Sequence, residues 1–169
     1  VRTGRKAAAR AWWQQMHTAL LATGVDGFKT DGGERMPDEW FHNLQPYYYQ
    51  RAALAAFPSN GMTFARSATA PCAGNATFWG GDQACTWNDL PRVVRAGLSA
   101  ALSGYFYWGH DAGGYAGTPT KNLYVRWLEL GALSPIFQLH GTTPREPWVY
   151  DDETVRIAKE RFPDLAPGD

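Results

Sequence analysis

A chain of 169 residues is long enough for one domain with a hydrophobic core, and its 44% hydrophobic content argues against disorder over the whole length. Sixteen basic and sixteen acidic residues cancel, and no cluster of lysine and arginine stands out, so nucleic acid and anionic membrane surfaces are poor candidate partners. No apolar run is long enough to cross a bilayer and no signal-peptide core follows the N-terminal VRTGRK, so we expect no membrane segment and leave the compartment open.

The first half of the chain alternates between helix-like and strand-like segments. Apolar residues at helical spacing (Trp12 or Trp13, Met16 and Leu20) predict the first helix, and Gly24 stands where that helix would end. The second predicted helix, over 46–56, has Pro46 in its first turn, where proline is favourable. In chain order the predicted elements are a helix over 6–23, a strand over 26–30, a helix over 46–56, and strands over 61–67 and 76–82.

The second half continues this alternation. Asn88 or Asp89 can cap a helix that carries Pro91 near its start, and four apolar residues of this helix share one face: Leu90, Val94, Leu98 and Ala101. The further elements expected are a strand over 103–111, a helix over 121–130, a strand over 134–141, and a capped, solvated helix within YDDETVRIAKERF.

Five strand-like runs, most of them separated by helices, predict an α/β fold with a parallel sheet whose strands are buried on both faces. A polar residue stands at or just after the end of each strand, namely Asp31, Arg66, Asp82, Asp111 and His140. In a (β/α)₈ barrel this edge carries the active site. An open, doubly wound sheet also binds ligands there, but neither GGDQAC nor DAGGYAG has the glycine and lysine spacing of a phosphate loop. Because a complete barrel needs eight strands and about 250 residues, we predict part of one.

Aromatic residues are abundant, with eight each of Trp, Tyr and Phe. Many of them will fill the core, but their position beside charged residues in TFWGGD and YFYWGHD favours a binding cleft, since flat Trp and Tyr rings form walls against sugar rings. The two cysteines, Cys72 and Cys85, are too few for a disulfide framework or a zinc site. They bracket one loop and a bridge between them is possible, but we favour free thiols.

Asp31 and Asp82 form the most notable pair, since each ends a strand beside glycines that let a ligand approach the backbone closely. Cleavage of a glycosidic bond needs two carboxyl groups, one ionised and one protonated. Lys29 and Arg66 can keep a neighbouring carboxylate ionised. The position of Asp82 after Trp79 and two glycines favours the protonated form that an acid catalyst needs. Membership in structural ion pairs explains the same aspartates equally well.

Other kinds of chemistry find less support. Asp82, Asp111, His110 and His140 offer metal-ligand atoms, but their spacing matches no recognised metal motif, so we expect no metal site. No G-x-S-x-G elbow marks a serine nucleophile. We interpret Arg145, between Pro144 and Glu146, as a structural residue.

Taken together, the motifs resemble those of glycoside hydrolase family 31, which contains α-glucosidases, α-xylosidases and related retaining α-glycosidases. The resemblance covers about residues 10–153 and implies that the five strands are the fourth to eighth of a (β/α)₈ barrel. The chain would then be a single domain over residues 1–169, a fragment of a longer catalytic barrel. The motifs are, in order, GVDGFKTDGGE, FARSA, FWGGD, SGYFYWGHDAGGY and FQLHG.

The resemblance also implies a role for each matching residue. Asp31 matches the catalytic nucleophile and Asp82 the general acid/base, which places their carboxyl groups about 5–5.5 Å apart in a retaining enzyme. No cofactor is implied. The expected partners are an α-glycoside and the rest of a longer chain, with a homo-oligomer as a further possibility. The residues that match sugar-binding positions are Lys29, Arg66, Trp79, Asp111 and His140.

Within the family, GFKTDGGE is closest to the α-xylosidase-like branch. A second hypothesis is that the chain is a sugar-binding or structural piece without turnover, because half a barrel leaves open sheet edges and a bare apolar face.

Overall fold

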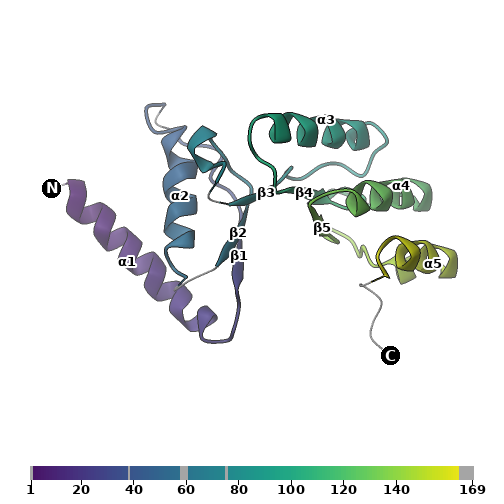
Figure 1. The fold of residues 1–169 in the computed structure, drawn as a ribbon, viewed down its shortest axis with the longest axis horizontal. Helices are drawn as coiled ribbons and strands as arrows, with labels where there is room; N and C mark the ends of the chain where they lie inside the picture. Colours follow the sequence, from purple (N-terminus) through teal and green to yellow (C-terminus); the bar gives the residue numbers. More distant parts are fainter. Residues whose placement is uncertain (1, 38, 58–60, 75, 164–169) are drawn as a thin grey trace. The chain divides into compact units, whose positions relative to one another are not determined.

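The structure is a computed structural model that describes residues 2–37, 39–57, 61–74 and 76–163, with side chains from residue 7 onward. Every predicted helix and strand is present, although the strands are shorter than the predicted runs (Figure 1). None of the described helices is long and apolar enough to cross a membrane. The elements in chain order are α1 (Arg2–Leu21), β1 (Gly27–Thr30), α2 (Leu44–Leu54), β2 (Met62–Ala65), the 3₁₀ helix η1 (Ala70–Cys72), β3 (Thr77–Trp79), α3 (Asp89–Leu102), β4 (Trp108–Asp111), α4 (Lys121–Ala132), β5 (Ile136–Gln138), the 3₁₀ helix η2 (Pro147–Val149) and α5 (Asp152–Arg161).

The strands of the described chain form a five-stranded sheet in the order β1-β2-β3-β4-β5. The pairs β1–β2, β2–β3 and β4–β5 are parallel. This order, with helices between most strands, confirms the predicted partial (β/α)₈ barrel.

The chain divides into two compact units, one of Val1–Phe78 with Ser103–Tyr105 and one of Trp79–Leu102 with Phe106–Asp169. The single domain over residues 1–169 stays a prediction.

In the first unit, α1 packs on α2, and α2 packs on β1 and β2. Of the predicted apolar stripe of α1, Met16 and Leu20 are half exposed, and of the two alternatives Trp12 and Trp13 it is Trp12 that is exposed. The ring of Trp13 stacks on His17 at 4.4 Å between centroids, and His17 meets Phe28 of β1 edge to face at 4.7 Å. The helix ends at Leu21 and turns at Gly24, as predicted.

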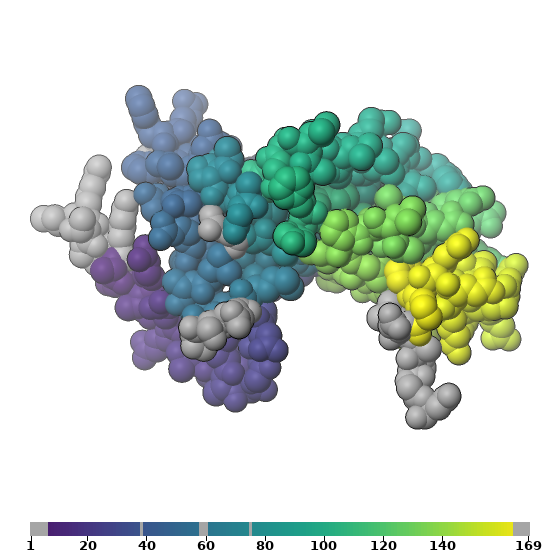
Figure 2. Space-filling view, viewed as in Figure 1, coloured from purple at the N-terminus to yellow at the C-terminus, as the bar shows by residue number. Residues whose placement is uncertain are grey.

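The core of the second unit gathers around α4, which packs against β5 and α5. In Figure 2, the green surface of α4 is continuous with the yellow surface of α5. The buried residues of α4 recur at helical spacing and form one apolar face. They are Leu123, Tyr124, Trp127, Leu128 and Gly131.

The buried face of helix α3 agrees with the predicted one only at Leu90, which packs against the core. Val93 is 2% exposed, whereas Val94 and Leu98 are 37% and 63% exposed. The reason is the indole of Trp108, which lies so close to Gly97 that a β-carbon there would come within 2.6 Å of the ring. Residues 93 and 97 share one side of the helix, and this side faces the core.

The strands are less buried than predicted. Each residue of β5 is only half-buried, and β1 has two exposed residues among four. Continuous hydrophobicity in the sequence therefore overestimates the burial of these strands within this chain. The solvated final helix is confirmed, with Asp151 as its N-cap accepting a hydrogen bond from the Thr154 amide at 2.8 Å.

The core position of Leu128 gives a first prediction. Leu128 is 1% exposed, and its truncation in a Leu128→Ala variant should lower the free energy of unfolding by about 2–5 kcal/mol because a cavity replaces packed atoms. Leu133→Ala, at a position 87% exposed just after the same helix, should change it by less than about 0.5 kcal/mol. Urea denaturation of the two variants measures both values, and equal losses would contradict this description of the core.

Candidate active site

In the first unit, Asp31 and Arg66 follow the ends of two paired strands. The parallel register aligns Thr30 with Ala65, so the next residue of each strand stands beside its neighbour. Arg66 Nη1 lies 3.2 Å from Asp31 Oδ1, and the same guanidinium also pairs with the carboxylate of Glu34. The Asp31 side chain is 71% exposed although it is paired. This carboxylate is therefore held by a cation and remains open to solvent.

The backbone after Asp31 depends on glycine. The amide of Gly32 donates to Asp31 Oδ1 at 2.7 Å, and Gly33 adopts a left-handed φ of +89°. A β-carbon on Gly33 would stand 2.6 Å from the hydroxyl oxygen of Ser67. No other residue fits this turn without displacing Ser67. The turn thus orients the Asp31 carboxylate through its own backbone.

Tyr49 of α2 supports the same segment, and sequence reasoning did not identify it. Its hydroxyl donates to the backbone carbonyl of Asp31 at 3.1 Å. Burial, and then the charge of Asp31, raise the pKa of Tyr49, so the hydroxyl keeps its proton. Tyr49 also lines a largely apolar pocket of about 320 Å³ together with Met36, Phe41, Leu44, Gln45 and Tyr48. The only signal in the sequence was the aromatic run PYYYQ.

Lys29 lies in β1, two residues before Asp31. Its ammonium is 5.9 Å from the centroid of the Phe64 ring, its register partner on β2. This distance is within the range of a cation–π contact. The contact holds the ammonium at the surface of the sheet.

In the second unit, Trp79 and Asp82 occupy the end of β3 and the turn that follows. Trp79 is only 4% exposed, whereas Asp82 is exposed. Gly81 between them has a φ of +80°, which favours glycine and turns the chain so that Asp82 leaves the strand. The predicted pair of aspartates is thus divided between the two units, with Asp31 in the first and Asp82 in the second.

Asp111 ends β4 and is fully buried. Gln138, its register partner at the end of β5, donates from Nε2 to Asp111 Oδ1 at 2.6 Å. Sequence reasoning did not identify Gln138, although its place inside the FQLHG motif was the available signal. His140 is exposed beyond the same strand, with its ring 5.3 Å from the ring of Tyr115.

His110, considered above as a metal ligand, is a core residue. The indole of Trp127 donates to His110 Nδ1 at 3.1 Å, and because indole can only donate, the imidazole proton must be on Nε2. Nε2 lies 3.1 Å from the Ser134 hydroxyl, which donates to the carbonyl of Leu130. Burial lowers the pKa of His110 to about 4, so the ring is neutral at physiological pH. Among the described residues, no group of three or more His, Cys, Asp or Glu is arranged to hold a metal ion.

Arg145 connects the loops around Asp82. Its side chain is 2% exposed, and it donates to the carbonyls of Gly114, Tyr115 and Gly117 at 2.8–3.1 Å and to the sulfur of Cys85 at 3.3 Å. The predicted structural role of Arg145 fits these contacts.

The segment that Arg145 holds is paired with the segment that follows Asp82. The amides of Tyr115 and Ala116 donate to the carbonyl of Gln83 at 2.8 and 2.9 Å, and the amide of Cys85 donates to Ala116 at 3.0 Å. The loop after β3 is therefore fixed through the loop after β4. Both cysteines are free, as favoured from the sequence, and burial raises the pKa of the Cys85 thiol although Arg145 acts in the opposite direction.

The strands are parallel and carry acidic side chains at or just after their C-terminal ends. This arrangement places the chain among (β/α)₈-barrel proteins. The chain belongs to glycosyl hydrolase family 31, whose TIM-barrel domain model matches residues 3–162.

Curated relatives cover most of this chain. The alpha-xylosidase of Emericella nidulans is 33% identical over 170 residues, which cover 90% of this chain and 22% of that protein. The isomaltosyltransferase of Sporosarcina globispora is 34% identical over 165 residues, which cover 83% of this chain and 15% of that protein. The chain thus spans about a fifth of the length of the curated relatives it matches.

Solved structures agree with the fold. The cycloalternan-degrading enzyme from Trueperella pyogenes in complex with isomaltose superposes with a TM-score of 0.81 and 30% identity, over 93% of this chain and 26% of that chain. The same enzyme in complex with a covalent intermediate gives a TM-score of 0.79 and 30% identity, over 91% and 25%.

The contacts of Arg145 lead to a second prediction. Arg145→Lys keeps the charge but cannot reach several loop carbonyls at once, and we expect the free energy of unfolding to fall by about 3 kcal/mol or more. Arg156→Lys, at an exposed position on α5 paired with Glu160, should change it by less than about 0.5 kcal/mol. Urea denaturation compares the two, and equal stabilities would show that the guanidinium geometry is unimportant.

The buried His110 leads to a third prediction. Its pKa is about 4 in the folded chain against 6.5 when unfolded, so between these values the unfolded state binds more protons. The buried neutral His110 therefore has no destabilising effect above pH 6.5. As the pH falls from 6.5 to 4, protonation of this histidine in the unfolded state lowers the free energy of unfolding by a total of about 3 kcal/mol, and below pH 4 the loss levels off.

A His110→Gln variant should lack this part of the acid-induced loss, whereas His42→Gln, at an exposed position before α2, should retain it. Thermal unfolding from pH 7.5 to pH 4 measures the difference. Parallel pH profiles for wild type and His110→Gln would contradict a buried neutral imidazole.

Proposed function

We propose that the protein containing this chain is a retaining α-glycosidase that removes a terminal α-linked sugar. The observation that carries the proposal is the exposed carboxylate of Asp31, held 3.2 Å from the Arg66 guanidinium at the end of β1. A nucleophile must be both ionised and accessible. A cation beside a carboxylate favours the ionised form, and the solvent exposure of the Asp31 side chain makes it accessible.

In the first step, a carboxylate oxygen of Asp31 forms a bond to the anomeric carbon while the glycosidic C–O bond breaks. Asp82, as the acid, transfers its proton to the departing oxygen. In the second step, Asp82 takes a proton from water, the water oxygen bonds to the anomeric carbon, and the ester to Asp31 breaks. Two inversions at one carbon retain the α-configuration. A covalent intermediate in the structure of the Trueperella pyogenes relative supports this pathway.

We assign the remaining polar residues to binding of the sugar. Carboxylate oxygens accept hydrogen bonds from hydroxyl groups, which is the contact with the sugar that we propose for Asp111. Lys29, Arg66 and His140 can donate to sugar oxygens, and Trp79 supplies an aromatic wall. Similarity to an alpha-xylosidase favours an α-xyloside, with an α-glucoside as the alternative.

Glycosyl transfer is a second candidate, because the chain is also similar to an isomaltosyltransferase. The same two carboxyl groups serve this reaction when a sugar hydroxyl replaces water in the second step. Product analysis with and without an added acceptor sugar separates the two activities.

The fourth prediction concerns the two aspartates and uses 4-nitrophenyl α-xyloside, α-glucoside and α-galactoside with the protein at its natural length. Asp31→Ala should lose activity on every substrate, because no covalent ester can form. Asp82→Ala should lose about 10²–10⁴-fold in kcat/KM on an unactivated disaccharide of the preferred sugar and less on the aryl glycoside, whose leaving group needs little protonation.

Asp152→Ala, at an exposed position in the first turn of α5, is the matched control and should keep wild-type rates. NMR of the first-formed product should show the α-anomer. Undiminished activity in Asp31→Ala would overturn the mechanism, and a β-anomer would overturn retention.

A further inference from the structure

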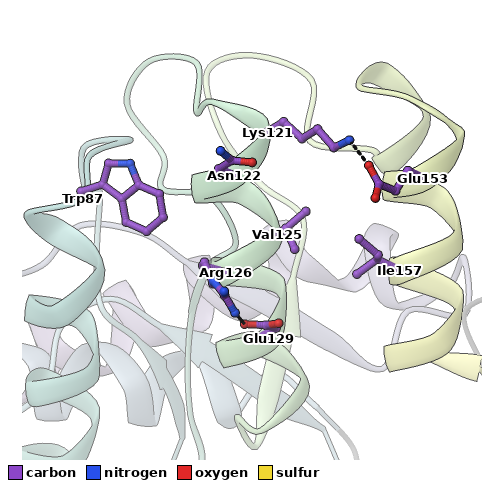
Figure 3. Close-up of a pocket in the computed structure, with 8 residues that line it drawn as sticks. All are labelled: Trp87, Lys121, Asn122, Val125, Arg126, Glu129, Glu153 and Ile157. Carbon is purple, nitrogen blue, oxygen red and sulfur yellow. Dashed lines mark hydrogen bonds and ion pairs between the residues drawn. The ribbon is translucent and has the colours of Figure 1, made fainter.

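A groove of about 530 Å³ lies on the outer face of α4 in the second unit, and it contains none of the residues assigned to the reaction (Figure 3). Trp87, from the loop before α3, forms one side, and Glu153 and Ile157 of α5 form the other. The volume is within the range of about 300–1,000 Å³ that is usual for small-ligand sites.

The apolar part of the groove is a flat aromatic surface opposite small aliphatic groups. Trp87 is 55% exposed and its ring points toward α4, while Val125 and Ile157 are half-buried. A large indole that stays open to solvent beside aliphatic side chains offers a platform for the apolar face of a ligand.

The polar part of the groove is electrically neutral. Lys121 pairs with Glu153, and Arg126 pairs with Glu129 at 2.8 Å (Figure 3). Lys121 also pairs with Asp151 at 2.7 Å. These ion pairs hold the side chains in place, yet their oxygens and N–H groups can still form further hydrogen bonds.

Two cations and two carboxylates line the groove, so neither a phosphate nor a strongly charged peptide finds a complementary charge. A ligand that fits is neutral, has an apolar face and carries many hydroxyl groups at its edge.

We propose that this groove binds a neutral carbohydrate chain, with one sugar ring stacked on Trp87 and its hydroxyls bonded to Lys121, Asn122 and Glu153. The proposed site binds a ligand and does not react with it, since none of the residues that line it is among those assigned to the reaction. It would keep the protein on a polysaccharide while the reaction takes place elsewhere.

The test is affinity electrophoresis of the natural-length protein in gels that contain dextran, soluble starch or xyloglucan. All samples carry Asp31→Ala, so that the polysaccharide is not consumed. Trp87→Ala removes the platform, and Val125→Arg fills the groove without touching the indole. Trp12→Ala is the matched control, since Trp12 is 58% exposed and lies on α1 of the first unit.

We expect Trp87→Ala to weaken retention on at least one polysaccharide by about tenfold. Val125→Arg should do the same, and Trp12→Ala should have no effect. The proposal is overturned if the protein is not retained in any gel, if both groove variants are retained normally, or if Trp12→Ala is as damaging as Trp87→Ala.

A parallel assay on the aryl glycosides, with Asp31 intact, separates this proposal from the proposed function. Trp87→Ala should keep the wild-type rate on these small substrates. Failure of the protein to hydrolyse any of them would overturn the glycosidase proposal, while retention that depends on Trp87 would still support the groove.

Discussion

The arrangement of the second unit depends on one buried cation, the guanidinium of Arg145. Its five N–H donors spread in a plane and satisfy carbonyl groups of the loop over residues 114–117, which in turn pairs with the segment after Asp82. A charge in this position costs solvation free energy, and several hydrogen bonds to oriented carbonyls offset that cost. As a result, the exposed Asp82 lies next to a loop whose backbone is fixed by hydrogen bonds to the segment that Arg145 holds.

The carboxylates at the strand ends are held in two different ways. Asp31 is solvent-exposed and shares Arg66 with Glu34, so its partner is a charge. Asp111 is fully buried and accepts a hydrogen bond from the amide of Gln138. Exposed pairing with a cation suits a group that must react, and buried hydrogen bonding suits a group that must keep one orientation. This difference is compatible with the proposed roles of Asp31 in the reaction and Asp111 in binding.

The outer face of α4 differs in character from the strand ends. At the strand ends, charged groups face solvent on short segments after strands, whereas in the groove the charges cancel in pairs along helices. Under the two proposals made above, a long carbohydrate ligand would be held at the groove while its terminal sugar reacts at the strand ends. Multivalent contact of this kind raises overall affinity without any change at the reacting site.

The sequence by itself determined the order of helices and strands, the partial barrel and the family, because hydrophobic periodicity, glycines and strand-end motifs are local features of the chain. It did not determine the buried faces of α1 and α3 correctly. In α1 it left Trp12 and Trp13 as alternatives, and Trp13 is the one that packs, against the ring of Tyr49, while Met16 is half exposed. In α3 Val93 is buried and Leu98 is exposed, because the ring that covers this helix, Trp108, comes from another segment. The same limit applies to Gln138, Tyr49 and the acceptors of Arg145. The contacts of Tyr49 with Asp31, of Gln138 with Asp111 and of Arg145 with Cys85 join residues 18 to 60 positions apart in the chain, and only the tertiary structure brings them within hydrogen-bond distance.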